Sequence, residues 1–369
     1  MKVLTIGGAM HDSIAIIESE RIERMVMRNA DTSFLLLEEG RKTEAHDIST
    51  HCGGGAVNTA VSFARLGFDT STLIKLGKDQ RADEILTRLE SEGVSTRWVM
   101  RDSTAPTGAS LLIASHDRNA AVFTFRGANT LLRESELQDN AFAVDLVYIS
   151  SLSNESADCF PQLVKKAKAQ GALVATNPGV RQLSARTGPF YETLSDIDIL
   201  SINQTEADAL VPYLVTSVGE GGPTLPLLPD EEPLTLVARG FSNGGYDITL
   251  PHFTKAMLER GLKYVVITAG SDGAFVASQD GLLFCPAHHI DVAGTAGGGD
   301  AFASTFAAFI TLGKPLENAI KAATLNSASV ISSIDTQTGL LGVDQLQNNL
   351  KEMTQELTLR HWTAQEAGF

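Results

Sequence analysis

The segment Gly294-Thr295-Ala296-Gly297-Gly298-Gly299-Asp300-Ala301-Phe302 combines a run of glycines with an acidic residue at the start of a predicted helix. Glycines let the backbone turn several N–H groups toward one point, and a helix N-terminus adds partial positive charge, so this segment predicts an anion site suited to phosphate. Asp300 could then accept a proton from a substrate hydroxyl, as aspartates do in phosphoryl transfer. Taken alone, Asp300 could equally be an acidic residue that stabilises a first helical turn.

A second glycine-rich segment, His51-Cys52-Gly53-Gly54-Gly55-Ala56-Val57-Asn58-Thr59-Ala60, also leads into a predicted helix. Three successive glycines allow a ligand to approach the main chain closely, and the Asn58 amide can donate and accept hydrogen bonds, which suits a polyol. The structural alternative is a turn that leaves Asn58 in solvent. The sequence has no GxxxxGK[ST] pattern and no complete GxGxxG after its first strand, so neither a P-loop nor a dinucleotide-binding fold is favoured.

Length, charge and cysteine content limit the classes of protein that could carry these loops. The 369 residues suffice for two or three domains, or for one large α/β domain with additions. A net charge of −15 without a basic run argues against a nucleic-acid partner. The three widely spaced cysteines predict reduced thiols. The apolar run at Met1 to Met10 is too short for a signal-peptide core, and no apolar stretch has the length of a membrane span. We therefore predict a cytoplasmic protein without a membrane partner.

Short apolar runs alternate with longer segments of helical periodicity along most of the chain, a pattern typical of βαβ units. We predict an α/β fold in which helices cover both faces of a mainly parallel sheet. The predicted strands are Val3 to Ile6, Ser71 to Leu76, Leu146 to Ile149, Leu173 to Thr176, Ile197 to Ile202 and Tyr264 to Thr268. The predicted helices are Gly54 to Leu66, Arg81 to Glu92, Phe160 to Ala169, Phe253 to Glu259, Ala301 to Leu312, Leu316 to Ser333 and Val343 to Met353.

Two regions depart from this alternation and predict a second, smaller β-sheet. Ser33 to Gly40 with Lys42 to Ser49, and Ser110 to Ser115 with Ala120 to Phe125, each have the pattern of two strands around a turn. This sheet could form a lid over the carboxyl ends of the main strands, where open α/β sheets bind ligands. The alternative is two surface hairpins unrelated to function.

The domain organisation follows from these patterns. We predict a main domain of residues 1–11, 53–104 and 127–369 and a lid of residues 12–52 and 105–126. Within the main domain, residues 211–249 are rich in Pro, Gly and acidic residues and predict an insertion with little regular structure.

In order and content, these segments resemble the ribokinase-like (PfkB) family of carbohydrate and nucleoside kinases over nearly the whole chain. Gly53 to Ala60 looks like the first signature of the family, and Gly297 to Phe302 looks like the second. Between them, Asn203-Gln204-Thr205-Glu206 looks like the family's NxxE element, and Thr268 to Ala274 looks like its nucleotide-binding TxGxxG turn. The resemblance implies a ribokinase-like three-layer sandwich with a mainly parallel central sheet and a small β lid.

The resemblance also implies roles in catalysis. Asp300 would be the catalytic base, and backbone amides would form the anion hole for the transferred phosphate. These amides are those of Gly297, Gly298 and Gly299. Glu206, with Asn203, would organise Mg²⁺ and phosphates through water, because Mg²⁺ keeps much of its hydration shell. The spacing of Asn203 and Glu206 is equally that of a helix-capping pair.

Two further sets of residues would contact the ligands. Those along the nucleotide would be Asn203, Thr268, Gly270, Gly273 and Asn326. Those that bind the substrate would be Asp12, Gly54, Gly55 and Asn58. A carboxylate such as that of Asp12 accepts two hydroxyl hydrogen bonds and thereby orients a sugar, although an Asp12 that faces solvent is the alternative.

Three departures from the family pattern affect the prediction. Gly294 stands where the second signature commonly has Asp, with Asp291 three residues earlier, which argues against monovalent-cation activation. Gly53-Gly54-Gly55-Ala56-Val57-Asn58 lacks the Lys of ribokinases, and Met10 stands where they have Asn, so ribose is disfavoured. Asn177-Pro178-Gly179-Val180-Arg181 resembles the DxNxR element without its first Asp, and a phosphate or substrate role for its arginine is a hypothesis.

We predict an ATP- and Mg²⁺-dependent phosphotransferase that phosphorylates a hydroxyl of a small carbohydrate, with the lid closing to exclude water. A nucleoside kinase of the same family is the alternative, and it would need apolar lid residues such as Phe34 or Phe123 around the base. A non-catalytic sugar-binding regulatory protein is a second alternative, although a pure binder would not need Asp300 and Glu206.

The resemblance is compatible with a homodimer through the lid, while a covered lid would serve a monomer equally well. His288-His289 match no zinc pattern and would point to opposite faces of a strand, so no structural metal is expected.

Overall fold

The structure, a computed structural model, describes residues 1–18, 23–26, 33–36, 39–40, 42–115, 120–226, 234–352 and 357–369. Its centre is a nine-stranded sheet with the order β19-β18-β17-β16-β13-β12-β11-β1-β6. These strands are β1 (Lys2–Ile6), β6 (Asp69–Leu73), β11 (Leu146–Ser150), β12 (Leu173–Asn177), β13 (Ile199–Asn203), β16 (Tyr264–Thr268), β17 (Gly273–Ser278), β18 (Gly281–Pro286) and β19 (Arg360–Thr363). From β6 to β16 all neighbours are parallel, and from β16 to β19 they are antiparallel.

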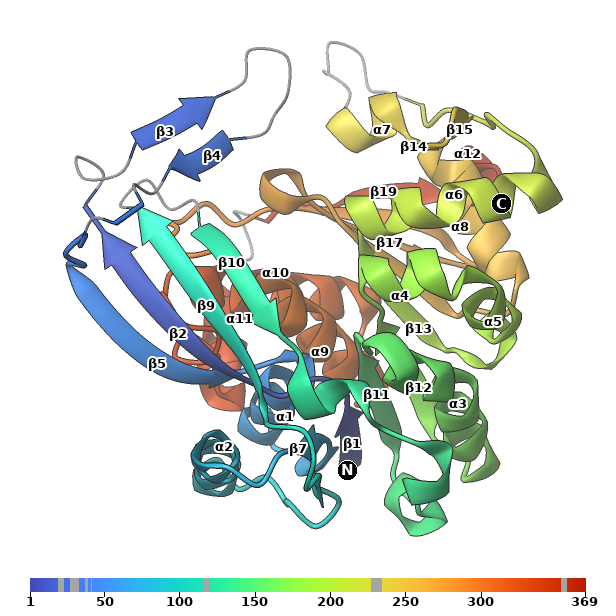
Figure 1. Cartoon of the computed structure of the whole chain (residues 1–369). Coiled ribbons are helices and arrows are strands. Elements are labelled where there is room, and N and C mark those ends of the chain that lie inside the picture. The colour runs from blue at the N-terminus through green and yellow to red at the C-terminus, as the bar shows by residue number, and fades with distance from the viewer. Residues whose placement is uncertain are drawn as a thin grey trace.

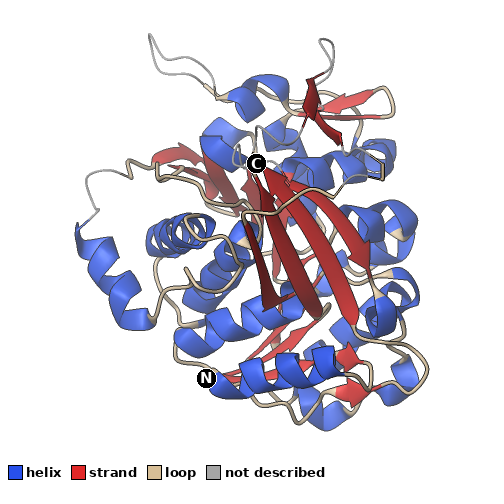
Figure 2. Ribbon diagram, turned by 60° about the vertical axis from the view of Figure 1, so that its left-hand side comes forward, coloured by secondary structure: helices blue, strands red, loops and turns tan. Residues whose placement is uncertain are grey.

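Helices cover both faces of this sheet, as predicted (Figure 2). One face packs against α3 (Phe160–Ala169), α4 (Val180–Ala185), α5 (Thr187–Glu192), α6 (Gln204–Val218) and α8 (Leu250–Glu259). The other packs against α1 (Gly55–Arg65), α9 (Gly298–Thr311), α10 (Leu316–Ile331) and α11 (Val343–Glu352), with α2 (Gln80–Ser91) against α1. In β11, Val147 and Ile149 enter the first core, and Leu146 and Tyr148 enter the second. Successive side chains of a strand point to opposite faces, so a continuous apolar run fills both cores.

A separate four-stranded sheet, which we call the lid sheet, stands at one side of the main sheet (Figure 1). Its strands, in the order β10-β9-β2-β5, are β2 (Met10–Ile17), β5 (Asp47–Gly53), β9 (Gly108–Ser115) and β10 (Ala120–Phe125). Strands β9 and β10 form a hairpin where one was predicted. The other predicted hairpin is wrong. Instead, β5 pairs with β2, and β4 (Ser33–Leu36) pairs with β3 (Glu23–Val26).

The prediction included no strand between Ile6 and Ser33, so it lacked the partner with which β5 pairs. The chain bends after β1 and re-enters extended structure at Met10, so Asp12 lies within β2. The mixed apolar and polar residues of β2 are those of a strand whose two faces meet different surroundings. Pairing of β2 with both β5 and β9 therefore fixes the position of Asp12.

The predicted insertion also has more regular structure than expected. Its first residues complete α6, and the later ones form α7 (Thr235–Arg239), β14 (Phe241–Asn243) and β15 (Tyr246–Ile248). Phe241 and Ile248 are buried in the main core. The many Pro, Gly and acidic residues of this segment gave no indication that Phe241 and Ile248 would be buried. Residues 227–233 lie outside the described part.

Three further elements are β7 (Lys75–Leu76), which pairs with β8 (Met100–Arg101), and α12 (Ala364–Ala367) near the carboxyl end of the chain. The predicted strand from Ser71 to Leu76 is thus divided between β6 and β7. No helix among the described residues has the length and apolar character needed to cross a membrane.

Candidate active site

The parallel strands of the main sheet end on one edge, and the glycine segments lie at that edge. Strand β1 leads into Gly7 and Gly8, and the Gly54 loop packs directly on them, because the Ala56 N–H donates to the Gly8 oxygen at 3.1 Å. Asn203 at the end of β13 is the register partner of Thr268 at the end of β16. Sheet topology therefore brings together segments that are far apart in sequence.

Glycine is required at the tightest points of this edge. Gly54 has φ +93°, and a Cβ there would lie 2.6 Å from the Gly8 oxygen. A Cβ at Gly55 would lie 2.7 Å from the Ser150 side chain and 3.5 Å from the Asp300 carboxylate. The loop thus passes between the first strand and Asp300 with no room for a side chain.

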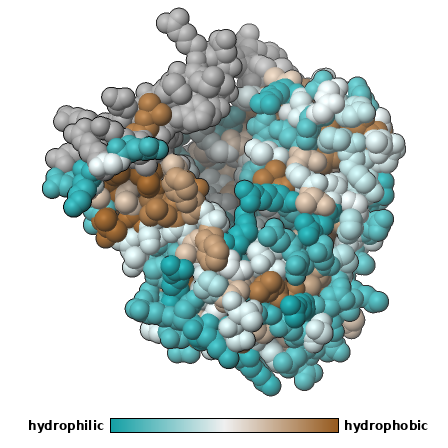
Figure 3. Space-filling model, in the orientation of Figure 1, coloured by the Kyte–Doolittle hydropathy of each residue, from teal (hydrophilic) through white to brown (hydrophobic). Residues whose placement is uncertain are grey.

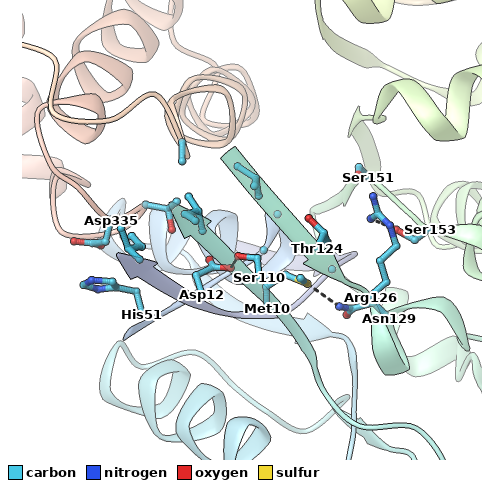
Figure 4. Close-up of a pocket in the computed structure, with 18 of the residues that line it drawn as sticks. Met10, Asp12, His51, Ser110, Thr124, Arg126, Asn129, Ser151, Ser153 and Asp335 are labelled. Carbon is cyan, nitrogen blue, oxygen red and sulfur yellow. Dashed lines mark hydrogen bonds between the residues drawn. The ribbon is translucent and has the colours of Figure 1, made fainter. Parts of the chain in front are cut away.

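A first cavity of about 320 Å³ lies between the lid sheet and this edge (Figure 4). The predicted substrate residues Asp12, Gly54 and Gly55 line it, together with Ser110. The Ser110 hydroxyl donates a hydrogen bond to the Asp12 carboxylate. Burial raises the pKa of Asp12, and the Ser110 hydrogen bond opposes that shift. An oriented carboxylate in such a cavity can accept hydrogen bonds from ligand hydroxyls.

Asn58, predicted to contact substrate, does not line this cavity. It is 4% exposed, and its Nδ2 donates to Asp300 Oδ2 at 2.8 Å. Its Oδ1 accepts from Thr336 Oγ1 at 2.8 Å and from Gln337 Nε2 at 3.2 Å. The structure therefore corrects its role, because the amide is already used to hold Asp300.

Asp300 lies in the first turn of α9, as the glycine run predicted. Burial raises the pKa of its carboxyl, and the hydrogen bond from Asn58 opposes the shift. Gly297 caps the helix with φ +81°, and a Cβ there would lie 2.7 Å from Thr336 Cβ. The first N–H groups of an α-helix have no partner within the helix, so those at Gly298 and Gly299 are available to an anion.

A second cavity of about 350 Å³ lies on the other side of the α9 N-terminus. It is lined by Thr268, Gly270, Gly273, Gly298 and Gly299, all of them predicted site residues. His288 and His289 both line it as well. The expectation that they point apart is wrong, because the segment after β18 is not a strand.

Asn326, predicted to lie near the nucleotide, is fully buried and does not itself line the second cavity, although its neighbours Thr324 and Ser327 do. Its Nδ2 donates to Thr305 Oγ1 at 2.8 Å, and its Oδ1 accepts from the Leu341 N–H at 2.9 Å. The amide thus joins α9, α10 and the loop before α11. Both ends of the side chain are thus satisfied within the protein, which gives Asn326 a structural role next to the second cavity.

Glu206 lies at the start of α6, where both hydrogen bonds of the capping pair are present. The Glu206 N–H donates to Asn203 Oδ1 at 2.9 Å, and Glu206 Oε2 accepts from the Asn203 N–H at 2.9 Å. Burial raises the pKa of Glu206 to about 7, the Asn203 hydrogen bond opposes this, and the nearby charge of Asp300 adds to it. The Glu206 side chain therefore caps α6 and also lies close enough to Asp300 for the two charges to interact.

The surroundings of Glu206 and Asp300 are suited to a cation. The buried Tyr148 hydroxyl has no hydrogen-bond partner among the described residues, and burial together with both carboxylates raises its pKa. Two negative carboxylates close together in a poorly solvated region repel each other, and a bound cation would relieve that repulsion. The described residues contain no cluster of three potential metal-ligating side chains. This donor set fits Mg²⁺, which often retains most of its water ligands, better than a metal enclosed by protein.

A third cavity of about 610 Å³ adjoins the first and shares Arg126, Ser151 and Ser153 with it. Arg181 and Glu206 also line it. A role for Arg181 was only a hypothesis from the sequence. Three other residues at the site were not predicted, namely Arg126, Ser110 and Thr336. No local motif surrounds those three residues, and only sheet pairing and loop packing bring them to the site.

Comparisons with known proteins identify the family and the fold of the chain. The chain matches the pfkB family carbohydrate kinases over residues 23–217 and 249–341. The deoxyribokinase of Salmonella typhi is 23% identical over 340 residues, 91% of this chain and 98% of that protein. The structure of Arabidopsis thaliana ribokinase complexed with ribose and ATP is similar at TM-score 0.69 and 20% identity, covering 95% and 98% of the two chains.

A second structure, an Escherichia coli protein of ribokinase II type in complex with ATP and Mg²⁺, has a TM-score of 0.72 at 16% identity and covers 95% of this chain and 99% of its own. These likenesses at low identity establish the ribokinase fold. The family match extends over most of the chain and includes the loops before α1 and α9. The chain therefore belongs to the pfkB family of carbohydrate kinases, and it is a sugar kinase.

Proposed function

We propose that the chain transfers the γ-phosphoryl group of ATP to a hydroxyl of a small carbohydrate held in the first cavity, with Asp300 as the base. The observation that supports this most directly is the position of Asp300. Asn58 holds its carboxylate beside the Gly55 loop of the first cavity, and α9 places it in the same first turn as Gly298 and Gly299 of the second. A hydroxyl and a phosphate bound in the two cavities would meet there.

Each residue contributes a separate physical effect to this reaction. Asp12 accepts hydrogen bonds from sugar hydroxyls and orients the attacking one. Asp300 takes the proton as the oxygen attacks phosphorus. The amides of Gly297, Gly298 and Gly299 donate to the transferred phosphoryl oxygens, as fixed dipoles at a helix N-terminus can. Thr268, Gly270 and Gly273 lie along the nucleotide, and Asn203 helps to arrange its phosphates. When bound near Glu206, Mg²⁺ neutralises phosphate charge.

An ADP-release assay tests this function. Purified protein with ATP and Mg²⁺ would be given separate panels of neutral sugars, acidic sugars, sugar phosphates and nucleosides, each also with Asp300→Asn. We expect turnover that depends on Asp300 with at least one carbohydrate. Turnover on nucleosides alone would favour the nucleoside kinase alternative, and binding without turnover would favour a regulatory protein.

Replacing Asn58 by Ala is expected to lower kcat by about 10- to 100-fold with little change in the KM for sugar, because a side chain that positions the base would be lost. The Asn58 hydrogen bond opposes the rise in the pKa of Asp300. Its removal should therefore move the acidic limb of the kcat profile to higher pH. An unmoved profile with a raised KM would instead mean that Asn58 contacts substrate.

The outer face of the lid sheet supports a homodimer. Strand alternation places Leu111 and Phe123 on the face opposite Asp12, Ser110 and Thr124. Phe123 thus faces away from the first cavity, and a role in a base pocket is not supported, while the side chain of Phe34 lies outside the described part. Figure 3 shows the resulting apolar patch. It includes Ile48, Leu111, Phe123 and Phe125, which are 69%, 42%, 57% and 53% exposed.

An apolar surface of this kind marks an interaction site. We expect a dimer in sedimentation velocity at micromolar concentration, and Phe123→Asp should raise its dissociation constant at least tenfold, as a charge at the centre of an apolar interface does. Leu312→Asp, an equally apolar exposed position at the end of α9, should leave the dimer unchanged. A monomeric parent protein would refute this assembly.

A reducing compartment, the cytoplasm, is the proposed location. The three cysteines are free thiols, and two of them, Cys159 and Cys285, are buried. Burial raises the pKa of Cys52 to about 11, so its thiol stays protonated and unreactive at neutral pH.

A further inference from the structure

The third cavity contains two arginines that have no carboxylate partner. Arg126 and Arg181 both line it, and no acidic group among the described residues lies within the 4.0 Å of an ion pair with either guanidinium. Arg186 lines the same cavity but is paired, because it donates to both carboxylate oxygens of Asp158 at 2.8 and 3.2 Å. Two of the three guanidinium groups are therefore available to a ligand.

The position of Arg126 is fixed by the protein. Its Nη1 donates to Ser153 Oγ at 2.6 Å, which leaves the other N–H groups free. Figure 4 shows its side chain extending toward Ser151 and Ser153, away from Asp12. Since Arg126 lines both the first and the third cavity, the two spaces adjoin, with the Asp12 carboxylate in the first and the two arginines beside it in the third.

The two arginines also disfavour each other electrostatically. Partial burial lowers the pKa of Arg126, and the charge of Arg181 adds to this effect. Guanidinium groups nevertheless stay protonated in proteins, so the repulsion persists unless an anion lies between them. A planar guanidinium matches the oxygens of a carboxylate or a phosphate, and two such groups form a strong site for either.

The transferred phosphate already has a candidate site at the N-terminus of α9. Glu206 lines the third cavity too, and its closeness to Asp300 identifies the end of that cavity where phosphoryl transfer would occur. Arg126 lies where the first and third cavities meet, and Arg181 lines the third cavity only. An anion held there is thus best placed as a part of the acceptor.

We infer that the carbohydrate substrate carries an anionic group, a carboxylate or a phosphate, which Arg126 and Arg181 bind while Asp12 orients the hydroxyls. This inference rests on the proposed function and specifies its substrate class. It concerns binding of the acceptor, so it can be measured without turnover.

The test compares matched trios of acceptors such as glucose, gluconate and glucose 6-phosphate, and the same trio built on ribose. Binding is measured by titration calorimetry without ATP, and kcat/KM by ADP release. We expect one class of anionic acceptor to bind at least tenfold more tightly than its neutral counterpart. Whether the acid or the phosphate ester is preferred identifies the anionic group. Neutral acceptors that bind as well as both anionic forms would overturn the inference.

Arg126→Gln and Arg181→Gln keep polar side chains and remove the charge. Each is expected to weaken binding of the anionic acceptor at least tenfold, to raise its KM similarly, and to leave the KM for ATP unchanged. Arg186→Gln, in the same cavity but paired with Asp158, should not change the preference. A rise in the KM for ATP without loss of acceptor binding would assign the pair to the nucleotide phosphates and contradict the inference.

Calorimetry with Asp300→Asn separates this inference from the proposed mechanism. If that variant keeps full turnover, the role of Asp300 as base fails, yet charge-dependent binding would still support the anionic subsite. If turnover depends on Asp300 but neutral and anionic acceptors bind alike, the kinase mechanism holds and the subsite is refuted.

Discussion

Asp300→Asn is expected to lower sugar-dependent turnover by about 10²- to 10⁴-fold, the usual contribution of a general base. An Asn side chain cannot take the proton of the attacking hydroxyl, but it has nearly the same shape and can still accept the hydrogen bond from Asn58. Burial raises the pKa of Asp300, so turnover of the parent protein should rise with pH through that raised value. ADP-release rates across pH measure both effects.

Folding and ligand binding of this variant should be preserved. A raised carboxyl pKa means that ionisation of Asp300 costs folding free energy at neutral pH, so a neutral Asn should melt at the same temperature or higher. ATP binding, measured by calorimetry, should change little. Asp69→Asn, at an exposed position at the start of β6, is the matched control and should keep full activity. Near-normal turnover in Asp300→Asn would refute the proposed base.

The main sheet could be predicted from the sequence because its strands are buried on both faces. In β11 and β16 nearly every residue is apolar, and such a run bounded by helical periodicity has few alternatives. The lid sheet was harder to predict. Strand β2 contains polar residues on both faces, and its partners β5 and β9 lie far along the chain, so the pairing depends on contacts that no local pattern encodes.

The same distinction holds for the site. Glycine runs before helices are local signals, and the positions of Gly54, Gly297 and Asp300 agree with them. Interactions between distant segments were not predictable. Asn58 contacts Asp300 across 242 residues of sequence, and a polar residue at the start of a helix can as readily face a ligand as support a neighbour. Asn326 shows the same ambiguity, since a buried amide can also satisfy both of its hydrogen-bonding ends within the protein.

Glu206→Gln is expected to lower kcat by about 10²-fold or more, because a site that arranges Mg²⁺ and phosphates would lose its charge. The same change should stabilise the folded protein in alkaline solution. Burial raises the pKa of Glu206 to about 7 from 4.5, so the folded state binds more protons than the unfolded state between these values. Stability from this group is present below pH 4.5 and is lost as the pH rises through 7.

The shift would correspond to about 3 kcal/mol if the side chain were fully shielded, and partial exposure reduces this to about 1–2 kcal/mol. Urea unfolding should therefore show Glu206→Gln more stable than the parent by that amount at pH 8, and the difference should shrink toward pH 5. Glu366→Gln is a matched control, because Glu366 occupies the same capping position in α12 but hydrogen bonds lower its pKa. Its replacement should not stabilise the protein at pH 8, since ionisation of Glu366 favours folding. If both variants respond to pH alike, helix capping explains the behaviour of Glu206. The opposite response would tie the raised pKa of Glu206 to its burial, to which the nearby charge of Asp300 adds.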